Sequence, residues 1–330
     1  MNPAVRYGAI GFGVLALGAG VFFAPAYLNA YLMYLLTWIA IYAIAGTGLT
    51  VLMGWTGQIA LAHAGLFGVG AYATAYLAGH GWPWPLAALT SSTASAGLGA
   101  LVGLPAARLR GFYLAIATLA FGELLHQAFV QLTPLSRGPQ GMAVVPIQLD
   151  GIDTPSLVWY LAMVILAAVM VTLTALGRSR IGRCLKAVRD IEPATGSLGI
   201  SAMRYKLLAF AISAFLAGLA GAVFGQLITF LTPDLFDLPL LVIFLVQLFV
   251  GGVNRLSGAL IGAIFVIAVR ELLQSHVVSS LVPALVGSGQ TLAFGLTLIL
   301  VVRYLPSGLA SLPARLRSRR PRPATLSPME

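Results

Sequence analysis

The sequence predicts an all-α polytopic membrane protein with about ten transmembrane or re-entrant helices. Of its 330 residues, 59% are hydrophobic and only 8% are charged, whereas a soluble protein carries about 25% charged residues. Its mean hydropathy is +0.94. Apolar runs of about twenty residues recur along the whole chain, and this is the length of helix that crosses a bilayer.

The apolar runs define the expected helices. They are 8–24, 30–53, 58–79, 86–104, 112–132, 156–177, 205–231, 238–252, 257–275 and 286–303. The first is expected to be a retained span, because only Arg6 precedes it among basic residues and no small-residue cleavage site follows. Two segments are weak, since 238–252 is short and 58–79 carries Gln58, His63 and several glycines. Either of these can instead be re-entrant.

The basic residues predict the topology. If Arg6 is cytoplasmic, the basic turn at 108–110 and the basic loop at 178–206 also fall inside, as the positive-inside rule requires. We therefore expect a transmembrane domain over 1–305, with both termini in the cytoplasm. The tail at 306–330 is basic and rich in proline, so we expect it to be disordered on anionic lipid headgroups. The formal charge of +10 thus indicates membrane lipid as a partner and not nucleic acid.

Small residues at four-residue spacing predict helices that approach closely. They are Gly221 and Gly225, Gly258 and Gly262, and Ala214, Gly218 and Ala222. The motifs M-G-W-T-G-Q at 53–58 and G-G-V-N-R-L-S-G at 251–258 each end one span and open another that contains glycine. They are a weak indication of an internal repeat, which transport proteins often have.

The motifs of common enzymes are missing from the sequence. The two lysines, Lys186 and Lys206, do not follow a glycine-rich phosphate loop, so the chain has no Walker A motif. There is no nucleophile elbow, no HExxH motif and no Cys/His metal cluster. Cys184 is the only cysteine, which excludes a disulfide within the chain. We predict a non-catalytic protein without a cofactor or a metal.

Ionisable and polar residues in predicted spans are candidates for a translocation path, because they are costly in lipid. Glu123 and His126 lie three residues apart on one helical face. We predict a path that includes Glu123, His63 and Gln58. The alternative for Glu123 is a buried acid bonded to a neighbouring helix, and for His63 a packed, hydrogen-bonded side chain.

A stand-alone secondary transporter or channel is an alternative function for the chain. Proton-coupled transport uses relays of acids and histidines within the membrane, and Glu123 is the one clear carboxylate in the middle of a span. Arg270 and Glu271 lie near the outer end of the ninth segment, where we expect them to extend to the interface. The sequence therefore favours this alternative less.

The cytoplasmic loop at 178–206 is longer and more patterned than a connector needs. Lys186–Ile200 is compatible with a short amphipathic helix, although Pro193 also suits a helix start. Gly199 suits a C-terminal stop. Such a helix can enter a groove on a soluble partner and transmit force to the membrane domain. The alternative is a basic helix that lies on the membrane surface.

Four stretches together resemble the permease subunits of ATP-binding-cassette importers for branched-chain amino acids, specifically the M-type of the two paired permeases. They are Gly48–Tyr72, Arg108–Leu124 with Ser136–Met142, Ser179–Ile200, and Gly251–Ala263. The resemblance covers roughly residues 30–305. It implies that the 178–206 loop contains the coupling helix that docks into an ATPase subunit.

The resemblance also implies which residues perform this coupling. The positions that match the family pattern are Gly182, Arg183, Ala187, Arg189, Asp190, Glu192, Ala194, Gly199 and Ile200. Their acids and arginines would form charge-assisted contacts in the docking groove. Glu123 and His63 also occupy positions that are similar to those of the family.

The partners implied by the resemblance are a second, H-type permease, two ATPase subunits and an extracytoplasmic substrate-binding protein, in a bacterial inner membrane. The chain departs from the family at Ile191, where a second acid is usual, and at Arg137, where glycine is common. These departures leave the substrate open. Branched-chain or related amino acids are expected, with urea and amides as the alternative.

Overall fold

The described part of the chain is almost entirely helical, which confirms an all-α polytopic membrane fold. The computed structural model describes residues 29–106, 108–109, 111–149, 151–190, 195, 199–274, 295–296 and 303. The expected segment at 8–24, most of that at 286–303 and the tail from 306 lie outside these residues. Within the described residues, seven helices are long and apolar enough to cross a membrane.

The helices agree in order with the predicted segments. They are α2 (Ala30–Leu49), α3 (His63–Gly79), α4 (Trp84–Ala106), α5 (Phe112–Gln131), α6 (Thr133–Ser136), α7 (Thr154–Arg178), α8 (Arg180–Asp190), α10 (Ala202–Ile228), α11 (Leu238–Gly251) and α12 (Leu256–Gln274). The other elements are the π-helix η1 (Thr50–Trp55), the 3₁₀ helices η2 (Gly138–Gln140) and η4 (Pro233–Phe236), and the strands β1 (Met142–Ala143) and β2 (Phe230–Leu231).

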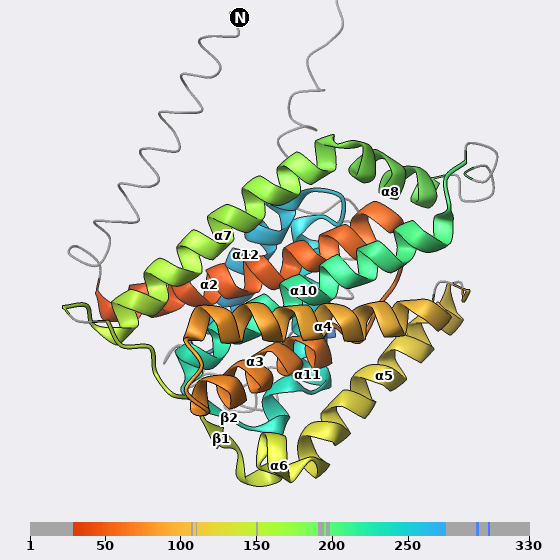
Figure 1. Ribbon diagram of the computed structural model, residues 1–330. Coiled ribbons are helices and arrows are strands. Elements are labelled where there is room, and N and C mark those ends of the chain that lie inside the picture. Colours follow the sequence, from red (N-terminus) through yellow and green to blue (C-terminus); the bar gives the residue numbers. More distant parts are fainter. Residues whose placement is uncertain are drawn as a thin grey trace, which may run out of the picture.

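Helix α10 lies at the centre of the bundle and packs along α2, α3 and α4 (Figure 1). Its crossing with α3 is close, because a Cβ atom on Gly70 would overlap the carbonyl oxygen of Gly218. A Cβ atom on Gly221 would likewise overlap the carbonyl oxygen of Phe67. The small residues predicted to bring helices together are therefore confirmed on α10.

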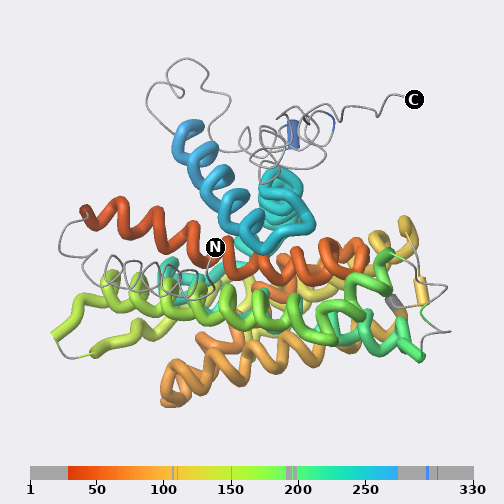
Figure 2. The backbone as a smooth tube through the Cα atoms, turned by 90° about the horizontal axis from the view of Figure 1, so that it is seen from above, coloured from red at the N-terminus to blue at the C-terminus, as the bar shows by residue number. Residues whose placement is uncertain are grey.

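Helices α11 and α12 form a pair that stands out from one face of the layer made by the other long helices (Figure 2). They pack against each other, and α12 also packs against α2. Phe244 of α11 is fully buried and contacts the rings of Tyr42 and Phe67 edge-on. The pair thus joins the bundle through an aromatic cluster.

The two ends of the bundle are distinct. At one end, here called the α8 end, α8 meets η1 and the turn between α11 and α12. At the opposite end, here called the strand end, β1 pairs antiparallel with β2, with Met142 opposite Leu231 (Figure 1). This pairing ties the connection between α5 and α7 to the connection between α10 and α11.

The predicted segment 58–79 begins with a break in the helix. Gly57 has a φ of +69°, a left-handed conformation that glycine adopts at little cost, and α3 starts only at His63. The amide of Leu61, in the non-helical stretch between them, donates to Oγ1 of Thr118 at 3.0 Å. The expected helix start at 58 was therefore wrong, because the glycine ends the preceding helix and the amide of Leu61 bonds to α5.

The other weak segment, 238–252, is a short helix with a capped start. The 14 residues of α11 extend for about 21 Å, which is less than the about 30 Å of a bilayer core. The carboxylate of Asp237 accepts a hydrogen bond from the amide of Leu238 at 2.6 Å. With the preceding η4, the segment Pro233–Gly251 is long enough to count as a candidate span.

Candidate functional site

The loop helix α8 begins at a sharp turn after α7. The hydroxyl of Ser179 accepts a hydrogen bond from the amide of Gly182 at 3.3 Å, which is the usual contact of a serine N-cap. A Cβ atom on Gly182 would overlap the carbonyl oxygen of Leu176, so only glycine allows the two helices to meet this closely. The predicted helix start at Lys186 was wrong by six residues, because Ser179 caps the helix and starts it at Arg180.

Helix α8 is amphipathic, as predicted. Its buried residues are Gly182, Leu185 and Val188, and Ala187 is half-buried. The Lys186 ammonium lies 5.3 Å from the ring centroid of Trp55, at the end of η1, a favourable cation–π geometry. The apolar face of α8 therefore packs on the bundle, while its other face remains exposed.

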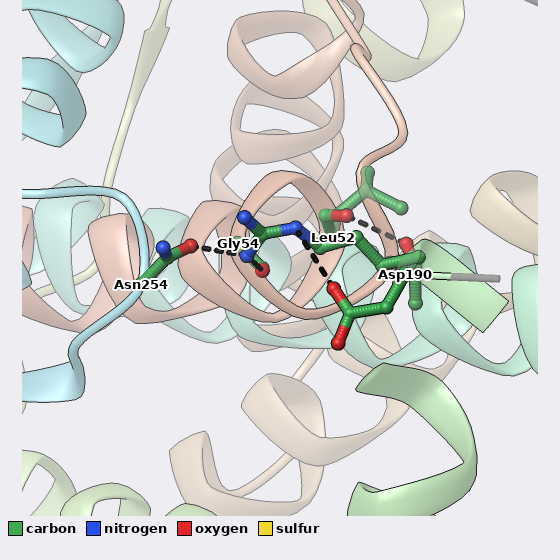
Figure 3. Close-up of polar contacts among 6 residues, drawn as sticks. Leu52, Gly54, Asp190 and Asn254 are labelled. Atoms are coloured by element: carbon green, nitrogen blue, oxygen red, sulfur yellow. Dashed lines mark hydrogen bonds and ion pairs between the residues drawn. The ribbon is translucent and has the colours of Figure 1, made fainter. Parts of the chain in front are cut away.

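Arg189 connects α8 to two transmembrane elements. Its Nη1 donates to the carbonyl oxygen of Gly54 in η1 at 2.6 Å and to Oδ1 of Asn254 between α11 and α12 (Figure 3). The side chain of Arg189 also passes Gly57, where a Cβ atom would lie 3.2 Å from Cγ of the arginine. One side chain on the loop helix thus bonds to the ends of two separate parts of the bundle.

The motifs at 53–58 and 251–258, which look alike in sequence, meet beneath Arg189. A Cβ atom on Gly54 would overlap the carbonyl oxygen of Val253, so the two backbones are in direct contact. Both motifs are visible in the sequence, but their spacing does not show that they meet. Their contact makes the junction of η1, α8 and the α11–α12 turn a compact unit.

The remaining predicted coupling residues that the structure describes lie on the outer side of α8 or after its end. Arg183 is exposed, and its Nη1 donates to the carbonyl oxygen of Arg178 at 2.9 Å. Asp190 lies 3.9 Å from Nε of Arg189, with 68% of its side chain exposed. Gly199 has a φ of +71°, and the amide of Ile200 donates to the carbonyl oxygen of Thr195. Glu192 and Ala194 lie outside the described residues.

His63 and Gln58 are buried inside the bundle. His63 is 2% exposed, and its Nε2 lies 3.0 Å from the carbonyl oxygen of Ala45, while Nδ1 lies 3.5 Å from Oγ of Ser213. Gln58 is 6% exposed, and its Oε1 has no hydrogen-bond partner among the described residues. The geometry of His63 matches that of a side chain held between neighbouring helices.

Glu123 lies near the middle of α5 and forms a cluster with His126 and Asp237. One ligand atom from each lies within 4.8 Å of the others, and Oε1 of Glu123 is 3.7 Å from Nδ1 of His126. Both ring nitrogens of His126 are buried without a hydrogen-bond partner in the described part of the chain. The three residues line a cavity of about 20 Å³, which has room for one water molecule. Among the described residues, this is the one His, Cys, Asp and Glu group that converges closely enough for a cation.

Two members of this cluster can be predicted from the sequence, and the third depends on tertiary packing. Glu123 and His126 share a helix face, so their spacing predicts their proximity. Asp237 reaches them from the start of α11, more than a hundred residues later. Its position as a helix N-cap can be read from the sequence, but the packing of α11 against α5 cannot.

Arg270 of α12 packs against α2. Its guanidinium lies 4.5 Å from the ring centroid of Trp38, a buried residue of α2. The neighbouring Glu271 instead accepts a hydrogen bond from the hydroxyl of Tyr31. The two adjacent charges therefore face different surroundings, and Arg270 lines a cavity.

The sequence of the chain is similar to those of known membrane transport proteins. The family model described as "Branched-chain amino acid transport system / permease component" matches residues 31–302. The high-affinity branched-chain amino acid transport system permease protein LivM of Salmonella typhimurium is 31% identical over 82% of this chain and 67% of its own length. LivM of Escherichia coli is 30% identical over the same shares.

A solved structure, PsaBC from Streptococcus pneumoniae in complex with Fab, aligns with a TM-score of 0.42 at 13% identity. This alignment covers 91% of this chain and 99% of that one.

Proposed function

Because the chain belongs to the family of permease components of branched-chain amino acid transport systems, we propose that it forms one side of the path of an ATP-driven importer for these amino acids. It would pair with a second, H-type permease in a bacterial inner membrane. Two ATPase subunits would bind the α8 end, which would be cytoplasmic, and a binding protein would deliver substrate to the strand end. The chain has no phosphate-binding loop, so ATP hydrolysis is assigned to the partners.

The observation that carries this proposal is the attachment of α8 at Arg189. An ATPase subunit that held the exposed face of α8, including Arg183 and Asp190, would move the helix as a unit. Arg189 would transmit this movement to Gly54 and Asn254 at once, because hydrogen bonds from a guanidinium are strong and directional. The guanidinium of Arg189 thus connects elements of the same chain. The exposed face of α8 is left for docking of the ATPase subunit.

The exposed face of α5 supports a path between two permeases. Glu123 is the twelfth of the 20 residues of α5, and 48% of its side chain is exposed. A carboxylate in the middle of a span is costly in lipid. A second permease that covered this face would remove Glu123 from lipid and place it beside the substrate path.

The buried residues His63 and Gln58 would support the helices that move during transport. His63 joins α3 to α2 and α10 through Ala45 and Ser213. Gln58 lies in the non-helical stretch that leads into α3, and broken helices of this kind often form transport sites. We assign both residues to the moving wall of the path.

A stand-alone proton-coupled transporter is the second candidate function. One observation favours it, since the structure brings Asp237 next to Glu123, and pairs of membrane carboxylates serve proton transport in other proteins. Family membership favours the importer. The energy source of transport separates the two candidates.

The experiment that tests the proposal is reconstitution of the tagged chain with its expected partners in proteoliposomes. We expect a second permease and two ATPase subunits to co-purify in mild detergent. Leucine uptake should then require both ATP inside and binding protein outside. Uptake by the chain alone, driven by a proton gradient, would overturn the importer proposal and favour the second candidate.

A further inference from the structure

A cavity between α2, α11 and α12 has one positive and one negative residue on otherwise apolar walls. Its volume is about 240 Å³, slightly below the about 300–1,000 Å³ of pockets for drug-sized ligands. Its lining includes Trp38, Asp234, Val242, Ile243, Val266 and Arg270. We call it the outer cavity, because Asp234 follows β2 at the strand end. Arg270 also lies about 21 Å along α12 from its start at the α8 end.

The guanidinium of Arg270 is held in a way that suits a carboxylate ligand. Its Cζ lies 4.5 Å from the ring centroid of Trp38, which is only 5% exposed. A guanidinium held over an aromatic ring by a cation–π contact still has N–H donors that can bind a carboxylate with two hydrogen bonds. The buried indole fixes the arginine before a ligand arrives, which lowers the entropic cost of binding.

The carboxylate of Asp234 supplies the opposite charge. It lies in the first turn of η4 and is exposed. Asp234 and Arg270 line the same cavity, yet no ion pair joins them in the described part of the chain. Two opposite charges that share a cavity without pairing leave a place between them for a ligand that carries both charges.

Part of the remaining wall of the outer cavity is aliphatic, beside the aromatic rings of Tyr42 and Phe224. Val242 and Ile243 from α11 face it together with Val266 from α12. Contact with such a wall stabilises a branched aliphatic side chain, because it removes apolar surface from water. The cavity therefore presents a cation, an anion and an aliphatic surface, which are the complements of the three parts of a branched-chain amino acid.

We propose that the outer cavity binds the zwitterion of a small aliphatic amino acid as it crosses the permease. Arg270 pairs with the α-carboxylate, Asp234 pairs with the α-ammonium, and the aliphatic wall receives the side chain. This inference rests on the proposed importer function and narrows its substrate class. Urea and simple amides carry neither charge, so their hydrogen bonds to the pair lack the ion–ion attraction that a zwitterion gains, and we expect them to bind more weakly.

The test measures direct binding to the purified complex of this chain with its partner subunits, without the binding protein. Radiolabelled leucine is the probe, in a scintillation proximity assay with the complex in detergent. The variants are Arg270→Gln and Asp234→Asn. The controls are Glu271→Gln, which changes the charge next to Arg270 but on the Tyr31 side, and Asp153→Asn, an exposed acid at the start of α7.

We expect each cavity variant to weaken leucine binding by about tenfold or more, because each loses a charge-assisted contact. The controls should change it by less than about twofold, since surface substitutions away from a site have small effects. Arg270→Lys keeps the charge but loses the planar fork, so its affinity should fall between wild type and Arg270→Gln.

Competitors that lack one charge provide a readout that misfolding cannot imitate. Isoamylamine is leucine without its carboxylate, and isocaproate is leucine without its ammonium group. Arg270→Gln should lose the preference for leucine over isoamylamine but keep the preference over isocaproate. Asp234→Asn should show the reverse pattern, because each variant removes the partner of one ligand charge.

Two readouts separate this inference from the proposed function. Unchanged leucine affinity in both cavity variants, or no leucine binding by the wild-type complex at tens of millimolar, would overturn the outer cavity as a zwitterion site. Failure of ATP-dependent uptake in every version, wild type included, would count against the importer function instead.

Discussion

Arg189 on the loop helix α8 donates a hydrogen bond to the backbone carbonyl oxygen of Gly54 at 2.6 Å, across a sequence separation of 135 residues. The same nitrogen donates to Asn254 in the turn before α12. A single side chain therefore attaches the helix proposed as the docking element to both η1 and the α11–α12 pair. This arrangement predicts that loss of the arginine uncouples the complex without taking it apart.

Arg189→Ala should retain the ATPase subunits but lose about tenfold or more of ATP-dependent leucine uptake, because two charge-assisted hydrogen bonds are removed. The measurements are co-purification and uptake in proteoliposomes. Arg204→Ala is the matched control, since it removes an exposed arginine at the start of α10, outside the α8 face proposed for docking. If Arg189→Ala instead releases the ATPase subunits, the arginine contacts the partner directly, and the role as an internal connection is wrong.

Gly182→Ala should displace α8 from the end of α7. A methyl group at this position would overlap the carbonyl oxygen of Leu176, and such overpacking costs about 1–3 kcal/mol. We expect weaker co-purification of the ATPase subunits with little change in the melting temperature of the membrane domain. Gly97→Ala in α4 is the control, because nothing lies within 4 Å of its Cβ position. Equal ATPase capture by both variants would contradict the prediction.

Gly70→Ala should destabilise the crossing of α3 and α10. The added methyl group would overlap the backbone of Gly218, so we expect a loss of about 1–3 kcal/mol and a lower melting temperature in detergent. Gly79→Ala lies at the end of the same helix with open space around its Cβ position. Thermal unfolding followed by size-exclusion chromatography compares the two, and similar melting temperatures would argue against a close crossing.

A photo-reactive side chain at Leu124 should crosslink to the second permease. Leu124 is 61% exposed on the face of α5 next to Glu123, and Val171 on α7 is 70% exposed as a matched position. We expect the partner on the α5 face because Glu123 would be costly in lipid. Mass spectrometry of the crosslinked complex identifies the captured chain. Capture at Val171 without capture at Leu124 would place the interface on α7.

Most spans could be predicted because their signal is local. The expected segment 112–132 corresponds to α5 at Phe112–Gln131, and 156–177 corresponds to α7 at Thr154–Arg178. A run of apolar residues forms a span when it is long enough to cross the bilayer and its free energy of transfer from water to lipid is favourable. Neither property depends on distant residues. Helix starts depended on shorter signals, namely Gly57 for α3 and Ser179 for α8.

The sequence alone thus determined the fold class, the order of the spans and the candidate roles of α8 and Glu123. Only the tertiary structure decided which residues meet. It brings Glu123 to Asp237, Arg270 to Trp38, and Arg189 to Gly54. The physical reason is that hydropathy acts along the chain, whereas these contacts depend on how small residues let the helices pack. Hydropathy assigns a residue to a span, and packing decides which residues it meets there.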